Sequence, residues 1–393
     1  TDGDGLRDGY EDNGGVFVSA TKTGTNPNMA DTDGDHESDA TEVREGTNPN
    51  LIADSSAARG LVAIDGVKDA LYPVASSVQT VQTGFGDNFS ELNAAYAYVK
   101  DGVLHLLLTG NLPDDSSKLE IFVDSAIGGQ TTFAGVPGNN GSDVMNGMVF
   151  DNGFTPDFHL IASRGPASFD LNIANLSAGK YDAYRNIFKV DNVAVSEGVG
   201  NTPVGRVNAR PIRVAYTNSN LAGIGGDEGA LANQVAALAV KTGFELKIAL
   251  TDLGNPSGVI RIQILQNNKD HKFLSNQSLG GLPVTTRNLG NPVTVNFNKF
   301  AGEQFFKVLV GARKGPTISN CTVDLTKKEF LFQANGLVVG EKYYLQNSTN
   351  LKTWKVITGT NFVAPSARLK LALGSDFKSK KPEYFRVMEG VSK

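Results

Sequence analysis

From about residue 60 onward, the chain alternates short apolar runs with clusters of Gly, Pro, Asn and Asp. Short runs that are rich in β-branched and aromatic residues and bounded by turn formers predict β-strands. In the middle of the chain we expect strands at residues 94–99, 103–109, 118–123, 157–162, 168–173, 244–250 and 258–265. Near its end we expect them at residues 322–325, 330–334, 343–347, 354–357, 369–373 and 384–388. Many short strands with little helical periodicity predict an all-β fold of the sandwich or jelly-roll type.

The sequence predicts the structure of two segments between strands in more detail. Lys100-Asp101-Gly102 joins the strands at 94–99 and 103–109 and predicts a tight hairpin, because Asp-Gly suits the primed turns whose twist matches that of paired strands. Residues 230–240 fit either a short helix or a strand that pairs through the turn at 241–243.

The length and the changes in composition predict several domains. A chain of 393 residues is too long for one ordinary domain, since a domain takes about 100 to 200 residues. The composition changes near residue 58, where an acidic segment gives way to the apolar runs, and residues 311–316 form a Gly/Lys/Pro turn. We therefore expect an acidic segment at 1–58, a large β-sandwich at 59–312 and a smaller β-sandwich at 313–393.

The charges are unevenly distributed along the chain. Residues 1–54 hold nine Asp and four Glu against three basic residues, a net charge of −10, whereas residues 321–393 hold twelve Lys and Arg against six acids, a net charge of +6. A nucleic-acid-binding protein shows a basic face with recognisable motifs, so we expect no nucleic-acid partner. No apolar run is long enough to cross a membrane. The acidic excess at the start of the chain needs its own explanation.

The acidic segment has the spacing of calcium ligands. Between Asp31 and Glu42, carboxylates occupy positions 1, 3, 5, 9 and 12 of a twelve-residue loop, and Glu37 at position 7 offers its backbone carbonyl. A Ca²⁺ ion takes about six to eight oxygens, and alternate residues of a curled loop point inward. The same spacing recurs upstream at positions 3, 5, 9 and 12, with Gly5 at the turn, where the second loop has His36. We expect calcium ligands at Asp2, Asp4, Asp8, Glu11, Asp31, Asp33, Asp35, Glu37, Asp39 and Glu42.

Both acidic loops end in the same tail, Gly-Thr-Asn-Pro-Asn, at residues 24–28 and 46–50. A loop and tail that recur together indicate an array of repeats. Residues 1–54 resemble the thrombospondin type 3 repeats of bacterial secreted proteins, and the resemblance implies that the acidic positions bind Ca²⁺. Because the sequence opens inside the first repeat, we expect that processing or truncation has removed what came before. Whether Asn28 or Asn50 adds an oxygen ligand stays open.

Two further stretches resemble known modules. Ile64-Asp65-Gly66, residues 95–99 and residues 243–250 are loosely similar to sandwich domains related to family 9 carbohydrate-binding modules. Those modules hold sugar with exposed tryptophans, and residues 59–312 contain none. Residues 340–354, followed by Phe385-Arg386-Val387, resemble the fibronectin type III-like modules that end many bacterial exported proteins. That resemblance favours a core position over a sugar platform for Trp354, the one tryptophan of the chain.

We find no pattern of residues that predicts catalysis. Metalloprotease, nucleophile-elbow and phosphate-loop motifs are missing from the sequence, and Gly223-Ile224-Gly225-Gly226 lacks the strand and helix of a dinucleotide site. His105 and His159 fall in strand patterns, and His271 falls in a turn, so we expect none of them to be a ligand. The single cysteine, Cys321, fits a small buried apolar residue better than a reactive thiol. A carboxylate pair for glycoside hydrolysis stays open, because the fold decides the separation of the carboxylates.

These observations lead to two hypotheses. The first is a calcium-stabilised extracellular structural or adhesive protein, a subunit of a cell-surface layer or filament, without enzymatic activity. Its partner would be a second copy of the chain, bound head to tail through the oppositely charged ends. The alternative is a polysaccharide-binding accessory module of a secreted bacterial protein.

Overall fold

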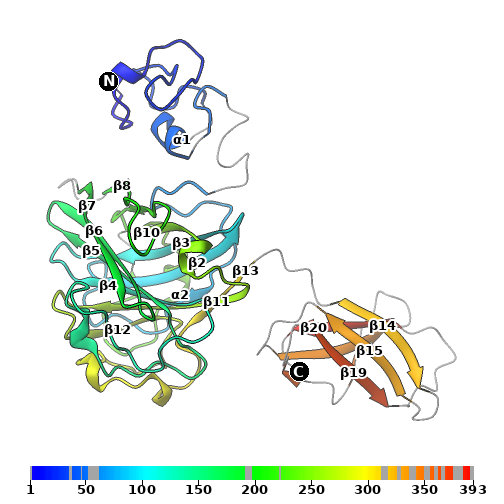
Figure 1. The fold of residues 1–393 in the computed structure, drawn as a ribbon. Helices are drawn as coiled ribbons and strands as arrows, with labels where there is room; N and C mark the ends of the chain where they lie inside the picture. The colour runs from blue at the N-terminus through cyan, green and yellow to red at the C-terminus, as the bar shows by residue number, and fades with distance from the viewer. Residues whose placement is uncertain are drawn as a thin grey trace. The chain divides into compact units, whose positions relative to one another are not determined.

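The computed structural model describes residues 2–34, 38–45, 47–51, 62–190, 197–220, 223–310, 317–324, 329–335, 342–348, 355–357, 362–363, 368–374 and 384–389. The chain divides into two compact units, Thr1–Val310 and Gly311–Lys393. Strands dominate both units, which confirms the predicted all-β fold (Figure 1). The domain boundaries at residues 58 and 312 stay predictions.

The described residues of the acidic segment are almost entirely loop. Its regular elements are the 3-10 turn η1 (Asp8–Tyr10) and the helix α1 (Asp39–Glu45). Gly3 and Gly5 have φ angles of 82° and 102°, values that residues with side chains rarely adopt. These glycines let the chain curl tightly between the acidic positions, and Gly5 does so at the turn position predicted from the sequence.

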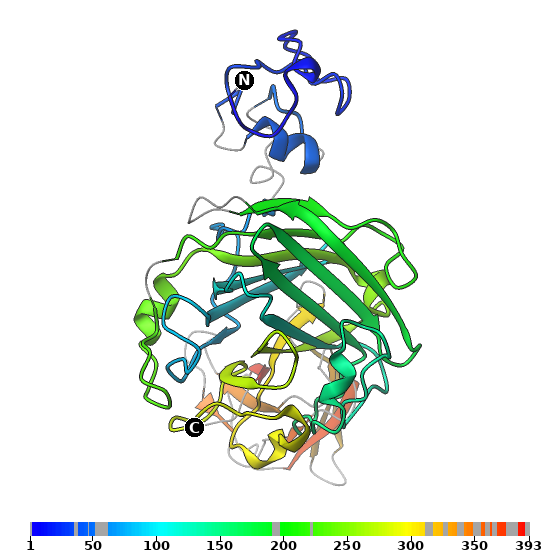
Figure 2. The same ribbon diagram turned by 90° about the vertical axis from the view of Figure 1, so that its left-hand side faces the viewer.

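The large domain is a sandwich of two antiparallel sheets (Figure 2). The first sheet has the order β1 (Ser77–Val78), β2 (Glu91–Lys100), β3 (Val103–Asn111), β10 (Gly243–Ala249), β9 (Arg213–Tyr216) and β8 (Gly198–Asn201). The second sheet has the order β12 (Leu274–Leu279), β11 (Gly258–Asn267), β4 (Lys118–Asp124), β5 (Phe158–Gly165), β6 (Ser168–Asn175) and β7 (Lys180–Lys189), and β13 (Phe306–Val310) also pairs with β11. The short helical elements are η3 (Ser142–Met145), α2 (Gln234–Ala239), η4 (Leu250–Leu253), η5 (Pro292–Thr294) and η6 (Phe297–Lys299).

The main core lies between the two sheets and follows from the alternation of side chains along each strand. On β4, Leu119, Ile121 and Val123 face this core, where they pack with residues of the first sheet such as Leu106 and Leu246. Alternate residues of a strand point to opposite faces, so Glu120 and Phe122 point away from it. Both are nonetheless fully buried, which means that another layer covers the outer face of the second sheet.

That layer comes from the loops. Phe133, Met145 and Phe150 on residues 125–157, together with Phe297, pack over Phe122 in a second apolar cluster. The glycine-rich stretch at 128–153 thus contributes large side chains to a core. Burial of each such side chain is worth about 1.5–3 kcal/mol.

The structure decides the conformation of the turn at residues 100–102 and of the segment at residues 230–240. Asp101 and Gly102 both have positive φ angles, 50° and 76°, as a primed hairpin turn requires. The ambiguous stretch at 230–240 contains the helix α2, and the Asn233 side chain caps it by accepting a hydrogen bond from the Ala236 backbone N–H at 3.1 Å. The predicted hairpin is therefore confirmed, and the helix is the correct alternative.

Several strands were not predicted, among them β7, β9, β12 and β13. On β12, residues Ser275, Asn276, Gln277 and Ser278 are all at most 1% exposed. Because these residues are polar, the hydrophobic pattern of the sequence could not predict this buried strand. The Asn276 side chain donates to the carbonyls of Gln82 and Thr286 at 2.8 and 3.0 Å, and such bonds offset the cost of burying a polar group.

The described strands of the C-terminal unit form two small antiparallel sheets. One has the order β14 (Thr317–Asp324), β15 (Glu329–Asn335) and β19 (Arg368–Gly374). The other has the order β17 (Lys355–Val356), β16 (Lys342–Ser348) and β18 (Phe362–Val363), with β20 (Tyr384–Glu389) also paired to β16. Tyr343, Leu345 and Val387 are buried. Trp354 and the side chain of Cys321 lie outside the described residues.

Among the described residues, no helix is long and apolar enough to cross a membrane.

Candidate metal centre

The first acidic loop gathers three of its four predicted ligands. Oxygen atoms of Asp2, Asp4 and Glu11 lie within 4.8 Å of one another. The backbone N–H of Asp4 donates to Asp2 Oδ1 at 3.2 Å, and that of Leu6 donates to Asp4 Oδ1 at 2.8 Å. These local bonds hold the carboxylates toward the inside of the curl. Asp8 is exposed and is not part of this group.

Glu11 is the most buried member of the group, with 4% of its surface exposed. Its Oε1 accepts a hydrogen bond from Thr25 Oγ1 at 3.2 Å. Its Oε2 and Asp2 Oδ2 are buried and have no hydrogen-bond partner among the described residues. Burial raises the pKa of Glu11, and the neighbouring carboxylates of Asp4 and Asp2 raise it further. A cation bound among the three would relieve this repulsion and supply the missing partner.

The second acidic loop is closed by hydrogen bonds of its own. Asp39 accepts the backbone N–H of Thr32 at 2.7 Å and its hydroxyl at 2.6 Å. Asp31 Oδ1 accepts the backbone N–H of Gly34 at 2.7 Å. Burial raises the pKa of Asp39 in spite of the two bonds from Thr32. Glu42 is fully buried and Asp33 is partly buried, whereas the predicted ligands Asp35 and Glu37 lie outside the described residues.

The two loops are joined to each other. Asp4 Oδ2 accepts the backbone N–H of Ala40, near the start of α1, at 3.0 Å. The carboxylate of Asp4 is also close enough to Asp39 to raise the pKa of Asp39. The negative charges of Asp4 and Asp39, which were predicted as ligands of separate loops, therefore lie close together. The spacing of residues within each loop could not predict this proximity.

The repeated tail has a structural role at this centre. Thr25 and Thr47, the threonines of the two tails, are both buried. Thr25 donates to the side chain of Glu11, and Thr47 donates to the backbone carbonyl of Glu42 through its N–H at 3.0 Å and its hydroxyl at 3.2 Å. Each tail thus fixes the glutamate at position 12 of the loop before it.

The two asparagines that the sequence left open differ in their surroundings. Asn50 donates through its Nδ2 to the Thr23 carbonyl at 2.8 Å, and its Oδ1 is buried without a hydrogen-bond partner among the described residues. Asn28 is exposed. Of the two side chains, that of Asn50 is therefore the more enclosed.

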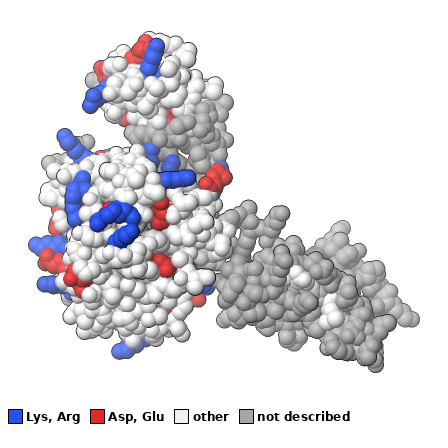
Figure 3. Space-filling model, in the orientation of Figure 1, with Lys and Arg blue, Asp and Glu red and all other residues white. Residues whose placement is uncertain are grey.

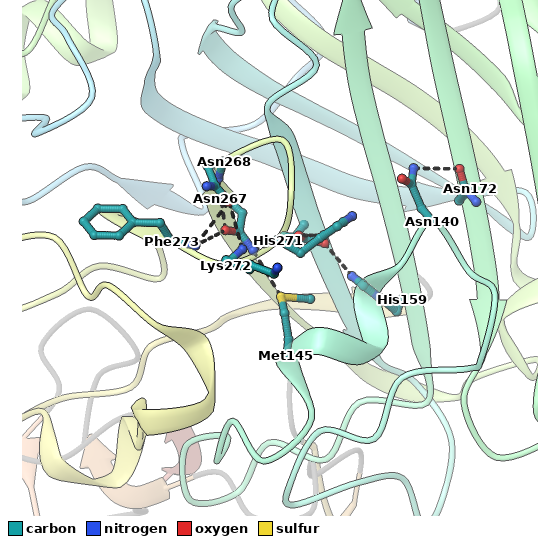
Figure 4. A network of polar contacts seen from close by, with 10 residues as sticks. Asn140, Met145, His159, Asn172, Asn267, Asn268, His271, Lys272 and Phe273 are labelled. Atoms are coloured by element: carbon teal, nitrogen blue, oxygen red, sulfur yellow. Dashed lines mark hydrogen bonds and ion pairs between the residues drawn. The ribbon is translucent and has the colours of Figure 1, made fainter.

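A separate cluster, which the sequence did not predict, lies on the outer face of the second sheet (Figure 4). Glu120 bridges two histidines: its Oε2 lies 2.8 Å from His159 Nε2, and its Oε1 lies 2.6 Å from His271 Nδ1. Asn267 donates to the same carboxylate at 3.1 Å. The His159 ring stacks on Phe122 with centroids 4.4 Å apart.

This His–Glu–His cluster is sealed inside the protein. Glu120 and His159 are 0% exposed and His271 is 1% exposed. Burial favours the neutral form of Glu120, but His271 and His159 outweigh it and hold the pKa of Glu120 below its ordinary value. Burial lowers the pKa of His159, and Glu120 opposes that effect. A site without solvent access suits a structural polar network better than catalysis. The sequence placed His159 in a strand and His271 in a turn, but it gave no signal that these two residues and Glu120 lie close together.

The described surface also contains a shallow groove of about 500 Å³ beside the first sheet, lined by Lys68, Tyr72, Pro73, Val74, Ala75, Val78, Tyr96, Leu238 and Lys241. Sugar-binding grooves present an exposed aromatic face, but Tyr72 and Tyr96 are only 4% and 2% exposed. The groove therefore lacks the stacking platform that the polysaccharide hypothesis needs.

Charged side chains do not gather into one patch on the face drawn in Figure 3, where basic and acidic side chains are interspersed among uncharged residues.

No family model and no curated protein matches this chain. Among solved structures, it is similar to the tetra-tandem repeat in the extending region of a large adhesion protein. The sequences are 11% identical, the match covers 77% of this chain and 71% of the other, and the TM-score is 0.18. A TM-score this low does not establish a shared fold.

Proposed function

We propose that this chain is an extracellular structural or adhesive protein without enzymatic activity, whose acidic segment is ordered by Ca²⁺. The observation that carries the proposal is the group formed by Asp2, Asp4 and Glu11. Glu11 is buried with an oxygen that has no hydrogen-bond partner among the described residues. Carboxylate oxygens without nitrogen or sulfur ligands suit a hard cation, and a curled Asp/Gly loop suits Ca²⁺ in particular.

A structural role is the one that this centre supports. Calcium that binds the folded loops and not the unfolded ones adds its binding free energy to their stability. Millimolar calcium is typical outside the cell, where sites with dissociation constants of about 10⁻⁴ to 10⁻³ M are occupied. The same weak sites would be empty in a calcium-poor cytoplasm, so the centre fits an extracellular location.

Assembly into a layer or filament is the second part of the proposal. The net charge of −10 on residues 1–54 and of +6 on residues 321–393 makes the two ends complementary. A head-to-tail contact between unlike surfaces produces an open chain of subunits when its rotation does not close. Bound calcium would reduce the acidic charge without reversing it.

Calorimetric titration of the chelator-treated chain with CaCl₂ tests the calcium centre. We expect binding heat in the parent protein, and a loss of affinity of tenfold or more in Asp4→Asn and Glu11→Gln. Asp12→Asn is the matched control, because Asp12 is exposed and its ion pair with Lys22 is long, at 3.8 Å. Equal calcium affinity in all four proteins would contradict the proposal.

A further inference from the structure

The outer face of the second sheet brings a buried lysine next to a buried asparagine. Lys118 on β4 and Asn267 on β11 are opposite each other in adjacent antiparallel strands, and they are 6% and 0% exposed. Leu119 faces the main core, so its neighbours Lys118 and Glu120 point to the outer face, where Asn267 contacts Glu120. Side chains of opposite residues start from Cβ atoms about 4.5–5.5 Å apart. The long side chain of Lys118 can therefore reach the carboxamide of Asn267.

The carboxamide of Asn267 is held in one orientation by its partners. Its Oδ1 accepts the backbone N–H of Asn268 at 3.0 Å and that of Phe273 at 3.2 Å. Its Nδ2 donates to Glu120 Oε1 and to Met145 Sδ, both at 3.1 Å, and Figure 4 shows Asn267 within this group of contacts. Exchange of the amide oxygen and nitrogen would break these bonds, because a carboxylate only accepts and a backbone N–H only donates. Two donors thus polarise the carbonyl, and the amide nitrogen lies against a carboxylate.

The amine of Lys118 lies in surroundings that favour its neutral form. Lysine is rarely buried unless it is paired, yet the described residues form no ion pair with Lys118. Burial lowers the pKa of Lys118; the carboxylate of Glu120 opposes that effect, and the guanidinium of Arg185 adds to it. A neutral amine is a nucleophile, whereas an ammonium group is not.

We propose that Lys118 and Asn267 form an amide bond with each other, which cross-links β4 to β11. Lys118 Nζ attacks Asn267 Cγ, and negative charge develops on Oδ1, where the N–H groups of Asn268 and Phe273 stabilise it. Glu120 takes one proton from the attacking nitrogen and passes it to Nδ2. The Cγ–Nδ2 bond then breaks, and ammonia leaves. An amine and a primary amide become a secondary amide and ammonia, so the step needs no oxidant or reductant.

His159 and His271 position Glu120 for this proton transfer. They hold its two carboxylate oxygens at 2.8 and 2.6 Å. Burial favours the neutral carboxyl, but the two histidines outweigh it and hold the pKa of Glu120 below its ordinary value. The carboxylate is therefore ionised and able to accept a proton. The lack of solvent access excludes turnover of an external substrate, but a single reaction within the chain needs no such access.

The cross-link joins two strands that are far apart in the sequence. Lys118 is the first residue of β4, and Asn267 is the last residue of β11, so a force that separates these strands at this end meets a covalent bond. The chain has a single cysteine and can form no disulfide within itself. The amide bond is a covalent link that requires no cysteine. This inference rests neither on calcium nor on the proposed function.

Peptide mapping of the denatured full-length protein tests the bond. We expect digestion with trypsin and tandem mass spectrometry to identify one branched peptide that contains residues 118 and 267 and is lighter, by one ammonia, than the sum of its two parts. Lys118→Arg keeps the positive charge without the reactive amine, and Asn267→Ala removes the carboxamide, so neither variant should give this peptide. Lys299→Arg, at an exposed lysine of η6, is the matched control and should be linked like the parent.

The branched peptide decides the test, and the intact mass alone does not. Ring closure at an Asn-Gly pair such as Asn152-Gly153 also releases ammonia, but it joins no second peptide. Separate, unmodified peptides with Lys118 and Asn267 from the folded parent overturn the inference, whatever the result of the calcium titration.

A further variant tests the part of Glu120. Glu120→Gln, shown to be folded by far-UV circular dichroism, should be mostly unlinked, because proton transfer of this kind contributes about 10²- to 10⁴-fold to a rate. A folded Glu120→Gln that is linked as completely as the parent contradicts the proton transfer through Glu120.

Discussion

Asp4 and Ala40 are 36 residues apart in the sequence, and the carboxylate of Asp4 accepts the backbone N–H of Ala40 at 3.0 Å. An acidic group at this end of a helix is favourable, because the first N–H groups of a helix have no partner inside it. The bond links the first acidic loop to α1, the helix in which the second loop ends. Calcium bound at either loop would therefore act on both.

Mutation of Asp4 tests this linkage. In calcium-free buffer, we expect Asp4→Ala to destabilise the acidic segment by about 1 kcal/mol, the typical cost of a lost helix cap. Asp4→Asn should cost less, because its amide oxygen can still accept the bond from Ala40. Hydrogen exchange measured by mass spectrometry on residues 38–45 reports the difference. Equal protection of this peptide in the parent and in Asp4→Ala would show that the bond contributes nothing.

Calcium should stabilise the acidic segment directly. At a free calcium concentration of 100 times the dissociation constant, one site adds about 2.7 kcal/mol. We expect peptides from residues 2–34 to lose their protection from hydrogen exchange when a chelator is added and to regain it with CaCl₂. MgCl₂ at the same concentration is the control, since Mg²⁺ dehydrates reluctantly and demands a tighter octahedral site. Protection that does not change with calcium contradicts the prediction.

The buried bridge from Glu120 to its two histidines should be a large contributor to the stability of the sandwich. Glu120→Gln leaves one buried histidine without its acceptor, and the loss of one partner of a buried charged pair costs about 3–5 kcal/mol. Urea denaturation of the variant and parent at pH 7 measures the difference. Glu228→Gln is the control, because the Glu228–Arg287 pair is exposed on the arginine side and 3.5 Å long, and such pairs contribute less than about 1 kcal/mol. Equal costs for the two variants would be inconsistent with this role.

His105 should make the sandwich sensitive to acid. Burial lowers the pKa of His105 to about 3, and the cations Lys247 and Lys100 add to that effect. In the unfolded chain its pKa returns to about 6.5, so between these values the unfolded state binds the extra proton. Stability is then lost as the pH falls below about 6.5, by roughly 2–3 kcal/mol at pH 4.5, since each pKa unit is worth about 1.4 kcal/mol.

Replacement of the histidine isolates its share of this acid sensitivity. His105→Gln should lose less stability than the parent between pH 7.5 and pH 4.5, while the two proteins should respond alike between pH 7.5 and pH 9. Urea denaturation at these three pH values gives the comparison. The same loss of stability in both proteins at pH 4.5 would exclude His105 as the source.

Self-association should depend on salt and on the charge of the basic end. We expect light scattering in 1 mM CaCl₂ to show growth of the particles with protein concentration at low salt, and their dissociation at about 0.5 M NaCl, where the Debye length falls below about 5 Å. Changing Lys378, Lys380 and Lys381 to Glu alters the charge of residues 321–393 from +6 to 0. This variant should remain monomeric. A parent protein that is monomeric under all conditions contradicts the assembly proposal.

Local patterns along the chain predict the class of fold and most of its strands. The strands β2, β3, β4, β6, β10 and β11 lie where alternating or continuous apolar runs predict them, because local side-chain periodicity decides which face of a strand is buried. The local pattern also predicts which acidic residues to consider, since the carboxylates of one loop are close together along the chain. Asp2, Asp4 and Glu11 are brought together as their spacing predicts.

Contacts between residues that are distant in the sequence follow from the three-dimensional fold and could not be predicted. The bridge among Glu120, His159 and His271 depends on the pairing of β4 with β5 and on the turn after β11. The approach of Gly223 to Asp87 and the contact between Asp4 and Ala40 also join residues that are remote in sequence. Strand order and loop packing determine such contacts. They minimise the free energy of the whole domain, and no local pattern of hydrophobicity or charge contains them.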